Sequence, residues 1–401
     1  MAVSGDWSSP RRLGTRGFRA GCRRFTFEVY RNPRLTQINP RQSRPRENAL
    51  VQAAPVKPLK RTPLHAREIS LREKVSHLSR PESYPENPAA VEVVQTHMSV
   101  VFLTGQHAWK LKKPVRHDFL DFSTLEDRRA DCEEELRLNR RLAPDVYLGV
   151  VPLAVTPQGA LRLGGDGVPV EWLVKMRRLP SQLMLYDAIR HGNVTRHDIR
   201  RLTLVLADFY RRAEPVDLDA AQYRQRLERD IHANREGLTP PEYSMPAGLV
   251  QSITASQLAV LARNAPLFDA RVAQRRIVEG HGDLRPEHVC LGPEPLFIDC
   301  LEFSRDWRVL DPADELAYLA MECEYAGAPW IGEVVFETYR EATGDAPPPP
   351  LVQFYKAHRA ILRAKLSAWH LKDHPDPADQ GKWVARAQRY LELAERYATV
   401  R

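Results

Sequence analysis

The chain has 401 residues, enough to bury a large core, and we expect it to fold into two lobes. No run approaches the roughly 18 apolar residues of a membrane-spanning helix, so we expect a soluble protein. The net charge of +8 resides near the N-terminus: residues 1–75 carry 17 Lys and Arg against 5 Asp and Glu, and the rest carries 42 against 46. The basic balance therefore does not indicate a body that binds nucleic acid.

Residues 1–66 are rich in Arg, Pro and Ser and show little periodicity, which predicts a disordered basic extension. Organelle transit peptides are also rich in Arg and poor in acids. The segment lacks an amphipathic helical stripe, so we prefer a simple extension or a start codon assigned too early. A weaker hypothesis is that this segment docks nucleic acid or an acidic partner.

The cysteines are odd in number and lack the close CxxC spacing of a zinc site: Cys22, Cys132, Cys290, Cys300 and Cys323. Cys290 and Cys300 would face each other across a predicted hairpin. We interpret them as small buried hydrophobic residues in a reducing cytoplasm, which is the expected location.

Residues 67–179 alternate between short strand patterns and one long helix. After a short helix through Leu78, the predicted elements are the strands Val91–Gln95, Ser99–Thr104 and Ala108–Lys112, the helix Leu125–Leu142, and the strands Tyr147–Thr156, Ala160–Leu163 and Val170–Met176. This order predicts a small antiparallel sheet braced by one helix, with a hinge at about Met176–Pro180.

Residues 180–401 are predicted to be mainly helical, with residues 281–299 as the one strand-containing unit. The expected helices are Met184–Arg190, His197–Arg212, Tyr223–Glu236, Val250–Asn264, Phe268–Arg275, Asp314–Glu324, Trp330–Thr343, Leu351–His370 and Lys382–Tyr397. The predicted fold class is therefore α+β, with a sheet-containing N-lobe and a helical C-lobe.

Two acids are brought together by the stretch that follows Gly280. A polar loop containing Asp283 precedes a short hairpin, and the apolar strand Pro295–Ile298 ends at Asp299. Phosphoryl transfer uses one carboxylate to orient and deprotonate a hydroxyl and another to hold magnesium. The alternative is a surface loop with an unrelated Asp on each side of a hairpin, but an acid that ends a buried strand is costly unless a cation pairs with it.

From Val91 to about His370 the chain resembles the aminoglycoside phosphotransferase-like family of the protein-kinase-like fold, and within it an uncharacterised bacterial group. The motifs are Gln95–Gly105, Ala108–Val115, Cys132–Pro144 and residues 280–322, and neither a G-x-x-x-x-G-K-[ST] nor a G-x-G-x-x-G motif occurs. The resemblance implies a bilobal fold, ATP with Mg²⁺ or Mn²⁺ as cofactors, and transfer of phosphate to a hydroxyl of a small molecule.

In this family Asp283 would be the catalytic base, His281 a structural brace of the loop, and Asp299 a metal ligand. Glu302 would be either an auxiliary ligand or a solvated turn residue. Glu315 would brace the catalytic loop, while Asp311 serves equally well as a helix cap.

Lys110 and Lys112 compete for the role of the lysine that grips the nucleotide phosphates. They lie two residues apart, so both point to one face of their strand, and we slightly prefer Lys110. Glu135 is the expected ion-pair partner, because Glu133 and Glu134 would point elsewhere from the same helix.

Two further parts of the nucleotide site follow from the resemblance. The backbone around Met176 and Arg178 would pair with adenine. The turn between the first two strands contains no glycine, so Thr96, His97 and Ser99 would contact the phosphates through hydroxyl and amide donors.

His288 departs from the family, which usually has Asn five residues after the catalytic Asp. Magnesium prefers oxygen ligands, whereas imidazole suits manganese, zinc or iron. Three alternatives follow, and the sequence does not favour any of them. His288 would ligate a metal such as manganese, it would indicate weakened catalysis, or water would coordinate the metal in its place.

Arg359, Arg363 and Lys365 form a cationic stripe on one predicted helix, which would suit an anionic acceptor. Ion pairing with the acidic lobe is the preferred explanation. The leading functional hypothesis is a metal-dependent phosphotransferase acting on a small-molecule alcohol. The alternative is a catalytically weak or inactive nucleotide-binding pseudokinase module.

Overall fold

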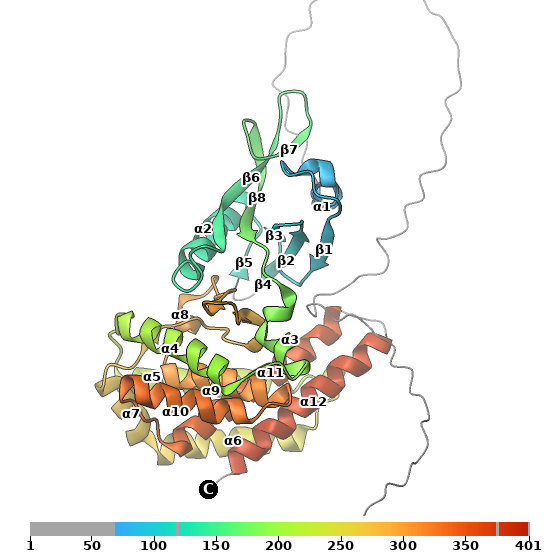
Figure 1. Ribbon diagram of the computed structural model, residues 1–401. Coiled ribbons are helices and arrows are strands. Elements are labelled where there is room, and N and C mark those ends of the chain that lie inside the picture. Colours follow the sequence, from blue (N-terminus) through green and yellow to red (C-terminus); the bar gives the residue numbers. More distant parts are fainter. Residues whose placement is uncertain (1–68, 118–119, 374–376, 400–401) are drawn as a thin grey trace, which may run out of the picture.

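Six antiparallel strands form the sheet of the upper lobe in Figure 1, in the spatial order β1-β2-β3-β8-β6-β7. The computed structural model describes residues 69–117, 120–373 and 377–399, so the predicted extension and Cys22 lie outside the described residues. The strands are β1 (Glu92–Gln95), β2 (Ser99–Leu103), β3 (His107–Lys112), β6 (Tyr147–Val155), β7 (Leu161–Leu163) and β8 (Val168–Arg177).

The two faces of this sheet have different partners because side chains alternate along each strand. Trp109 and Leu111 of β3 point into a core that includes Leu78 of α1 (Leu71–Leu78). Val174 of β8 belongs to a second cluster, which contains Cys132 of the bracing helix α2 (Leu125–Asn139). The predicted strand alternation is thus confirmed, with one face packed on α1 and the other on α2.

The lower lobe is built mainly from helices (Figure 1). They are α3 (Leu185–Arg190), α4 (Arg196–Arg212), α5 (Ala220–Glu236), α6 (Ala247–Arg263), α7 (Ala265–Ala273), α8 (Arg305–Arg308), α9 (Pro312–Tyr325), α10 (Trp330–Thr343), α11 (Pro349–Asp373) and α12 (Pro377–Thr399). Together with the sheet lobe, this confirms the predicted α+β architecture, with a sheet-containing N-lobe and a helical C-lobe.

The loop that carries Asp283 lies between two pairs of very short strands. β9 (Val278–Glu279) pairs with β12 (Val309–Leu310), and β10 (Val289–Cys290) pairs with β11 (Leu296–Phe297). The prediction of a single strand-containing unit in this lobe was therefore wrong. It missed β9 and β12 because two-residue strands leave no periodic pattern.

Another short pair, β4 (Arg116–His117) with β5 (Leu120–Asp121), was also missed, for the same reason. Short 3₁₀ turns complete the secondary structure: η2 (Pro81–Ser83), η3 (Ser181–Leu183), η4 (Pro241–Tyr243) and η5 (Pro286–His288). η3 begins immediately after the predicted hinge at about Met176–Pro180, which includes the end of β8.

An apolar cluster joins the lobes beneath the sheet. Leu296 and Ile298 from the C-lobe hairpin pack against Val146, Tyr147 and Val174 of the N-lobe. Burying one such aliphatic side chain stabilises a fold by roughly 1.5–3 kcal/mol. The strand that leads to Asp299 therefore packs against the sheet that carries Lys110 and Lys112.

Cys132, Cys290, Cys300 and Cys323 are buried free thiols, which confirms that they are small buried residues. Cys290 lies opposite Leu296 in the hairpin, so the expectation that it faces Cys300 was wrong. Among the described residues, no helix combines the length and the apolar character that crossing a membrane requires.

Candidate active site

Lys110 connects the N-lobe sheet with helix α2 and with the C-lobe. Its Nζ lies 2.9 Å from Glu135 Oε1 on α2 and 2.8 Å from Asp299 Oδ1 beyond β11. Burial alone would lower the pKa of Lys110, but Asp299 and Glu135 raise it well above its ordinary value. The ammonium is therefore charged, and the predicted pairing with Glu135 is confirmed.

Lys112 lies deeper on the same face, as the two-residue spacing predicts. Its side chain is 0% exposed, and its Nζ is 2.8 Å from Glu135 Oε2 and 2.5 Å from Asp131 Oδ2. It also pairs with Glu302. The side chain of Lys110 is 13% exposed, so Lys110 is the lysine better placed to meet a ligand.

Glu302 is therefore part of a buried ionic cluster and not a solvated turn residue. Lys112 holds Glu135, Asp131 and Glu302 around one ammonium. Burial raises the pKa of Asp131 to about 7, although Lys112 acts in the opposite direction. Glu133 instead pairs with Arg129 on the surface of α2, as its helical position predicts.

Asp299 occupies an uncommon backbone conformation at the end of the β11 strand. Its φ is +61°, in the left-handed region that few residues other than glycine adopt, and Asp is among those that do. Its N–H donates to the hydroxyl oxygen of Tyr147 at 3.0 Å, and the next N–H, of Cys300, donates to Asn139 Oδ1 at 2.9 Å. These bonds hold the carboxylate toward Lys110.

The two carboxylate oxygens of Asp283 differ in the hydrogen bonds that they accept. Arg285 Nε and Tyr318 Oη each donate to Oδ1 at 3.0 Å. Within the described part of the chain, Oδ2 receives no hydrogen bond, and its contact with His288 Nδ1 is 3.6 Å long. Burial would raise the pKa of Asp283, but Arg285 and His288 lower it to about 2, so the carboxylate is ionised.

His288 is held in one orientation by two hydrogen bonds. Its Nδ1 lies 2.8 Å from the carbonyl oxygen of Asp283, and Arg285 Nη2 lies 2.9 Å from its Nε2. Nε2 is also 3.5 Å from Asp299 Oδ2. Burial, followed by the charge of Arg285, lowers the pKa of His288, so the ring is neutral.

His281 and Glu315 brace the catalytic loop, as predicted. His281 Nε2 donates to the carbonyl oxygen of Ile298 at 2.9 Å, and its Nδ1 accepts the N–H of Asp283 at 3.3 Å. Glu315 Oε1 accepts the N–H groups of His281 and Gly282 at 2.9 and 2.6 Å. Asp311 caps α9 by accepting the N–H of Ala313, so its predicted capping role is also confirmed.

The predicted adenine-binding residues lie at the end of β8. Met176 lies opposite Ala108 of β3 and Tyr147 of β6, and the N–H of Arg178 donates to the carbonyl oxygen of Gln106 at 2.8 Å. Both residues therefore help to hold the sheet at the hinge. Their role in binding adenine stays a prediction.

The glycine-free turn between β1 and β2 is closed by its own threonine. Thr96 Oγ1 accepts the N–H groups of Met98 and Ser99 at 3.3 and 2.9 Å. The ring of His97 stacks on that of His370 near the end of α11, with centroids 4.3 Å apart. Two of the three predicted phosphate contacts are thus engaged within the protein.

The cationic stripe on α11 is largely ion-paired. Arg359 Nη2 lies 2.6 Å from Asp314 Oδ2, and Arg363 Nε lies 2.7 Å from Glu322 Oε1. Burial lowers the pKa of Lys365 to about 8. The preferred explanation, ion pairing with the acidic lobe, is confirmed for the two arginines.

Three residues of the site were missed by sequence reasoning. Arg285 stands inside the loop motif, where a cation two residues after Asp283 was a usable signal. Tyr147 and Tyr318 bond Asp299 and Asp283 from 152 and 35 residues away in the chain. Such partners leave no local signal.

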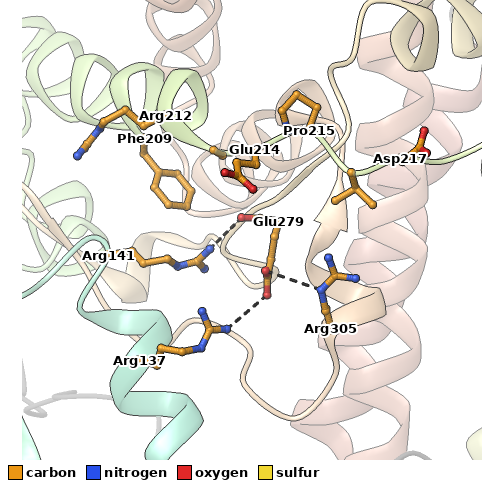
Figure 2. A pocket seen from close by; sticks show the side chains of 11 residues that line it. Arg137, Arg141, Phe209, Arg212, Glu214, Pro215, Asp217, Glu279 and Arg305 are labelled. Atoms are coloured by element: carbon orange, nitrogen blue, oxygen red, sulfur yellow. Dashed lines mark hydrogen bonds and ion pairs between the residues drawn. The ribbon is translucent and has the colours of Figure 1, made fainter.

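A cavity of about 580 Å³ opens behind the catalytic loop and does not include Asp283, Asp299 or Lys110 (Figure 2). Arg141 lies at its wall and donates to the carbonyl oxygens of Glu279 and Gly280 at 2.9 and 2.8 Å. The carboxylate of Glu279 faces Arg137 and Arg305 at 3.8 and 3.9 Å. These residues hold the start of the loop that carries Asp283.

The carboxylate of Asp299 fits a divalent ion carried by a nucleotide. It is a hard oxygen donor, and its side chain is 44% exposed. Among the described residues, no group of three or more His, Cys, Asp or Glu side chains could hold a metal by itself. Magnesium in such sites is held by one or two carboxylates together with substrate phosphates, which agrees with a single protein carboxylate.

No protein-family model matches the chain. Uncharacterised proteins of Mycobacterium bovis and of two strains of Mycobacterium tuberculosis are 33% identical to it over 317 residues, which are 78% of this chain. The chain spans 61% of the length of these curated relatives.

Solved structures similar to the chain are small-molecule kinases and phosphotransferases. A choline/ethanolamine kinase family protein from Mesorhizobium loti is 16% identical, with 81% of this chain and 97% of that chain covered and a TM-score of 0.45. A choline kinase from Cryptosporidium parvum is 10% identical, with 80% and 94% covered and a TM-score of 0.48. An aminoglycoside 2′-phosphotransferase in its GDP complex is 16% identical, with 77% and 92% covered and a TM-score of 0.43.

Proposed function

We propose that the protein is an ATP- and divalent-metal-dependent phosphotransferase that acts on a hydroxyl of a small molecule. One observation carries the proposal: an ionised Asp283, whose Oδ2 receives no hydrogen bond from the described residues, lies in the same loop assembly as Asp299. Lys110, paired with Glu135, reaches Asp299 from the other lobe. A base, a metal-binding carboxylate and a paired lysine are the groups that phosphoryl transfer requires.

In the proposed reaction Asp283 Oδ2 accepts a hydrogen bond from the acceptor hydroxyl. The hydroxyl oxygen forms a bond to the γ-phosphorus, the bond from that phosphorus to the β,γ-bridging oxygen breaks, and the hydroxyl proton passes to Asp283. ATP and its ion supply the phosphoryl group and neutralise its charge. Lys110 would exchange Asp299 for the phosphates while Glu135 keeps its ammonium in place.

The proposed acceptor is a small molecule, and an anionic acceptor is a prediction from the sequence alone. Arg359 and Arg363 form ion pairs with Asp314 and Glu322, so they do not favour an anionic acceptor.

A second candidate function is a nucleotide-binding module without turnover. It is favoured by His288, because neither ring nitrogen supplies the oxygen ligand that Asn would provide. The two functions differ in one measurable respect: both predict nucleotide binding, and only the first predicts transfer of phosphate.

The test is a phosphorylation screen over a panel of metabolite alcohols, with ATP and either Mg²⁺ or Mn²⁺. We expect turnover by the native chain and a loss of about 10²–10⁴-fold in Asp283→Asn, since a positioned base contributes that much. Asp166→Asn, at an exposed turn, is the matched control. Unchanged turnover in a folded Asp283→Asn variant would remove the proposed base, and nucleotide binding without turnover over the whole panel would support the second function.

A further inference from the structure

Both ring nitrogens of His288 are used within the catalytic loop. A carbonyl oxygen only accepts, so Nδ1, at 2.8 Å from the carbonyl oxygen of Asp283, carries the proton. In a neutral ring Nε2 then holds a lone pair, and the guanidinium of Arg285 donates to it from 2.9 Å. The imidazole therefore acts as an acceptor for Arg285.

This bond joins the guanidinium to a ring that contacts both acids of the site, since His288 Nδ1 lies 3.6 Å from Asp283 Oδ2. Arg285 Nε lies 3.0 Å from Asp283 Oδ1, and the ring nitrogen that accepts from Nη2 is itself 3.5 Å from Asp299 Oδ2. The side chain of Arg285 is only 16% exposed. A permanent positive charge is thus held beside the proposed base and next to the ring that contacts Asp299.

The donor set at this position does not fit a second metal ion. Kinases that use two magnesium ions hold them with the Asp equivalent to Asp299 and with an Asn oxygen at the position of His288. Here the side chain offers no oxygen. A metal bound to Nε2 would lie roughly 2.0–2.2 Å from it and would have to replace the N–H of Arg285.

We propose that the site takes one divalent ion per nucleotide and that Arg285, oriented by His288, supplies the positive charge of the second. A guanidinium suits this task because its parallel N–H groups match phosphate oxygens. Arg285 would contact the transferring phosphate, and His288 would act as a positioning residue. The inference rests on the proposed function.

The first test counts ions by the electron paramagnetic resonance signal of free Mn²⁺. The full chain is titrated with Mn²⁺ in the presence of an ATP analogue whose β,γ-bridging oxygen is replaced by methylene. We expect one bound ion per nucleotide in the native chain and two in Arg285→Met combined with His288→Asn. Two ions in the native chain, or a single ion in the double variant, would overturn the inference.

The second test asks which atoms touch the bound ion. Pulsed measurements on the same complex should show no imidazole coupling that disappears in His288→Asn, with the exposed His191→Asn as control. A coupling lost only in His288→Asn would make His288 a metal ligand and refute the assignment.

The kinetic signature separates a charge role from a structural one. Arg285→Met should lower kcat by about 10²–10³-fold with a small change in KM for the nucleotide, and Arg285→Lys should recover part of it. Equal losses in the Lys and Met variants would contradict the role. If the folded native chain bound neither nucleotide nor Mn²⁺, the proposed function itself would fail, and the inference with it.

Discussion

Glu315 offers a direct measure of how much the brace beneath the catalytic loop contributes. The side chain is 1% exposed, and three donors converge on its carboxylate: the N–H groups of His281 and Gly282, and the hydroxyl of Tyr210 at 2.6 Å from Oε2. We consider two substitutions, Glu315→Ala and Glu315→Gln, which remove different parts of this arrangement.

The alanine variant leaves all three donors without their partner. Each buried unsatisfied donor costs about 1–3 kcal/mol, and water entering the space would keep each near the lower end, so we expect a loss of about 3 kcal/mol. Glutamine retains one carbonyl oxygen for the backbone N–H groups of His281 and Gly282, and its NH₂ can donate to Tyr210. The negative charge and the acceptor for the Tyr210 hydroxyl hydrogen are lost, so we expect about 1–1.5 kcal/mol.

The free energy of unfolding would be measured by urea denaturation, with the exposed Glu392→Gln as the matched control. Phosphotransfer should fall in both variants because the loop carries the proposed base. The reasoning is refuted if Glu315→Ala costs less than about 1 kcal/mol, or if glutamine costs as much as alanine.

Three other substitutions have expected outcomes in urea denaturation. Lys112→Met leaves three buried carboxylates without their cation and should lower the free energy of unfolding by about 3–5 kcal/mol. Lys110 is more exposed, so Lys110→Met should lower it by less, and equal losses would contradict the buried cluster. Gly282→Ala, at φ +86° and with its Cβ 3.0 Å from a neighbouring side chain, should cost about 1–3 kcal/mol, while Gly248→Ala in α6 should be neutral or stabilising. Burial lowers the pKa of His358 from 6.5 to about 4, so as the pH falls the unfolded chain takes up the proton first and the free energy of unfolding decreases between these pH values. Relative to His358→Leu, the native chain should lose about 2–3 kcal/mol of stability between pH 7 and pH 4. Parallel stability profiles of the two chains over this pH range would disprove the prediction.

The elements of the sheet were predictable because one face of each strand is buried. In β3 the alternation of Trp109 and Leu111 with the lysines shows which residues share a face. It could not decide between Lys110 and Lys112, which share a face by the same rule. Their difference is one of depth, and depth depends on how α2 and the C-lobe hairpin cover the strand.

The candidate site was predictable where its chemistry is local. Asp283, His288 and Asp299 stand in one short segment, and the braces His281 and Glu315 follow from the motif. The hydrogen bond of Arg285 to His288 depends on the loop conformation, in which 3₁₀ geometry over Pro286–His288 turns the ring back toward Asp283. Sequence spacing alone does not contain that turn.

The contact of Lys110 with Asp299 also has a consequence for synthesis of the chain. The two residues are 189 positions apart, an interval that takes roughly 10–40 s to translate. Until the C-lobe hairpin leaves the ribosome, the underside of the emerging N-lobe sheet lacks Leu296 and Ile298 and its lysines lack two of their acidic partners. A chain truncated before Asp299 would therefore keep the ion pair of Lys110 with Glu135 but would leave Lys110 and Lys112 without their partners from the C-lobe, Asp299 and Glu302.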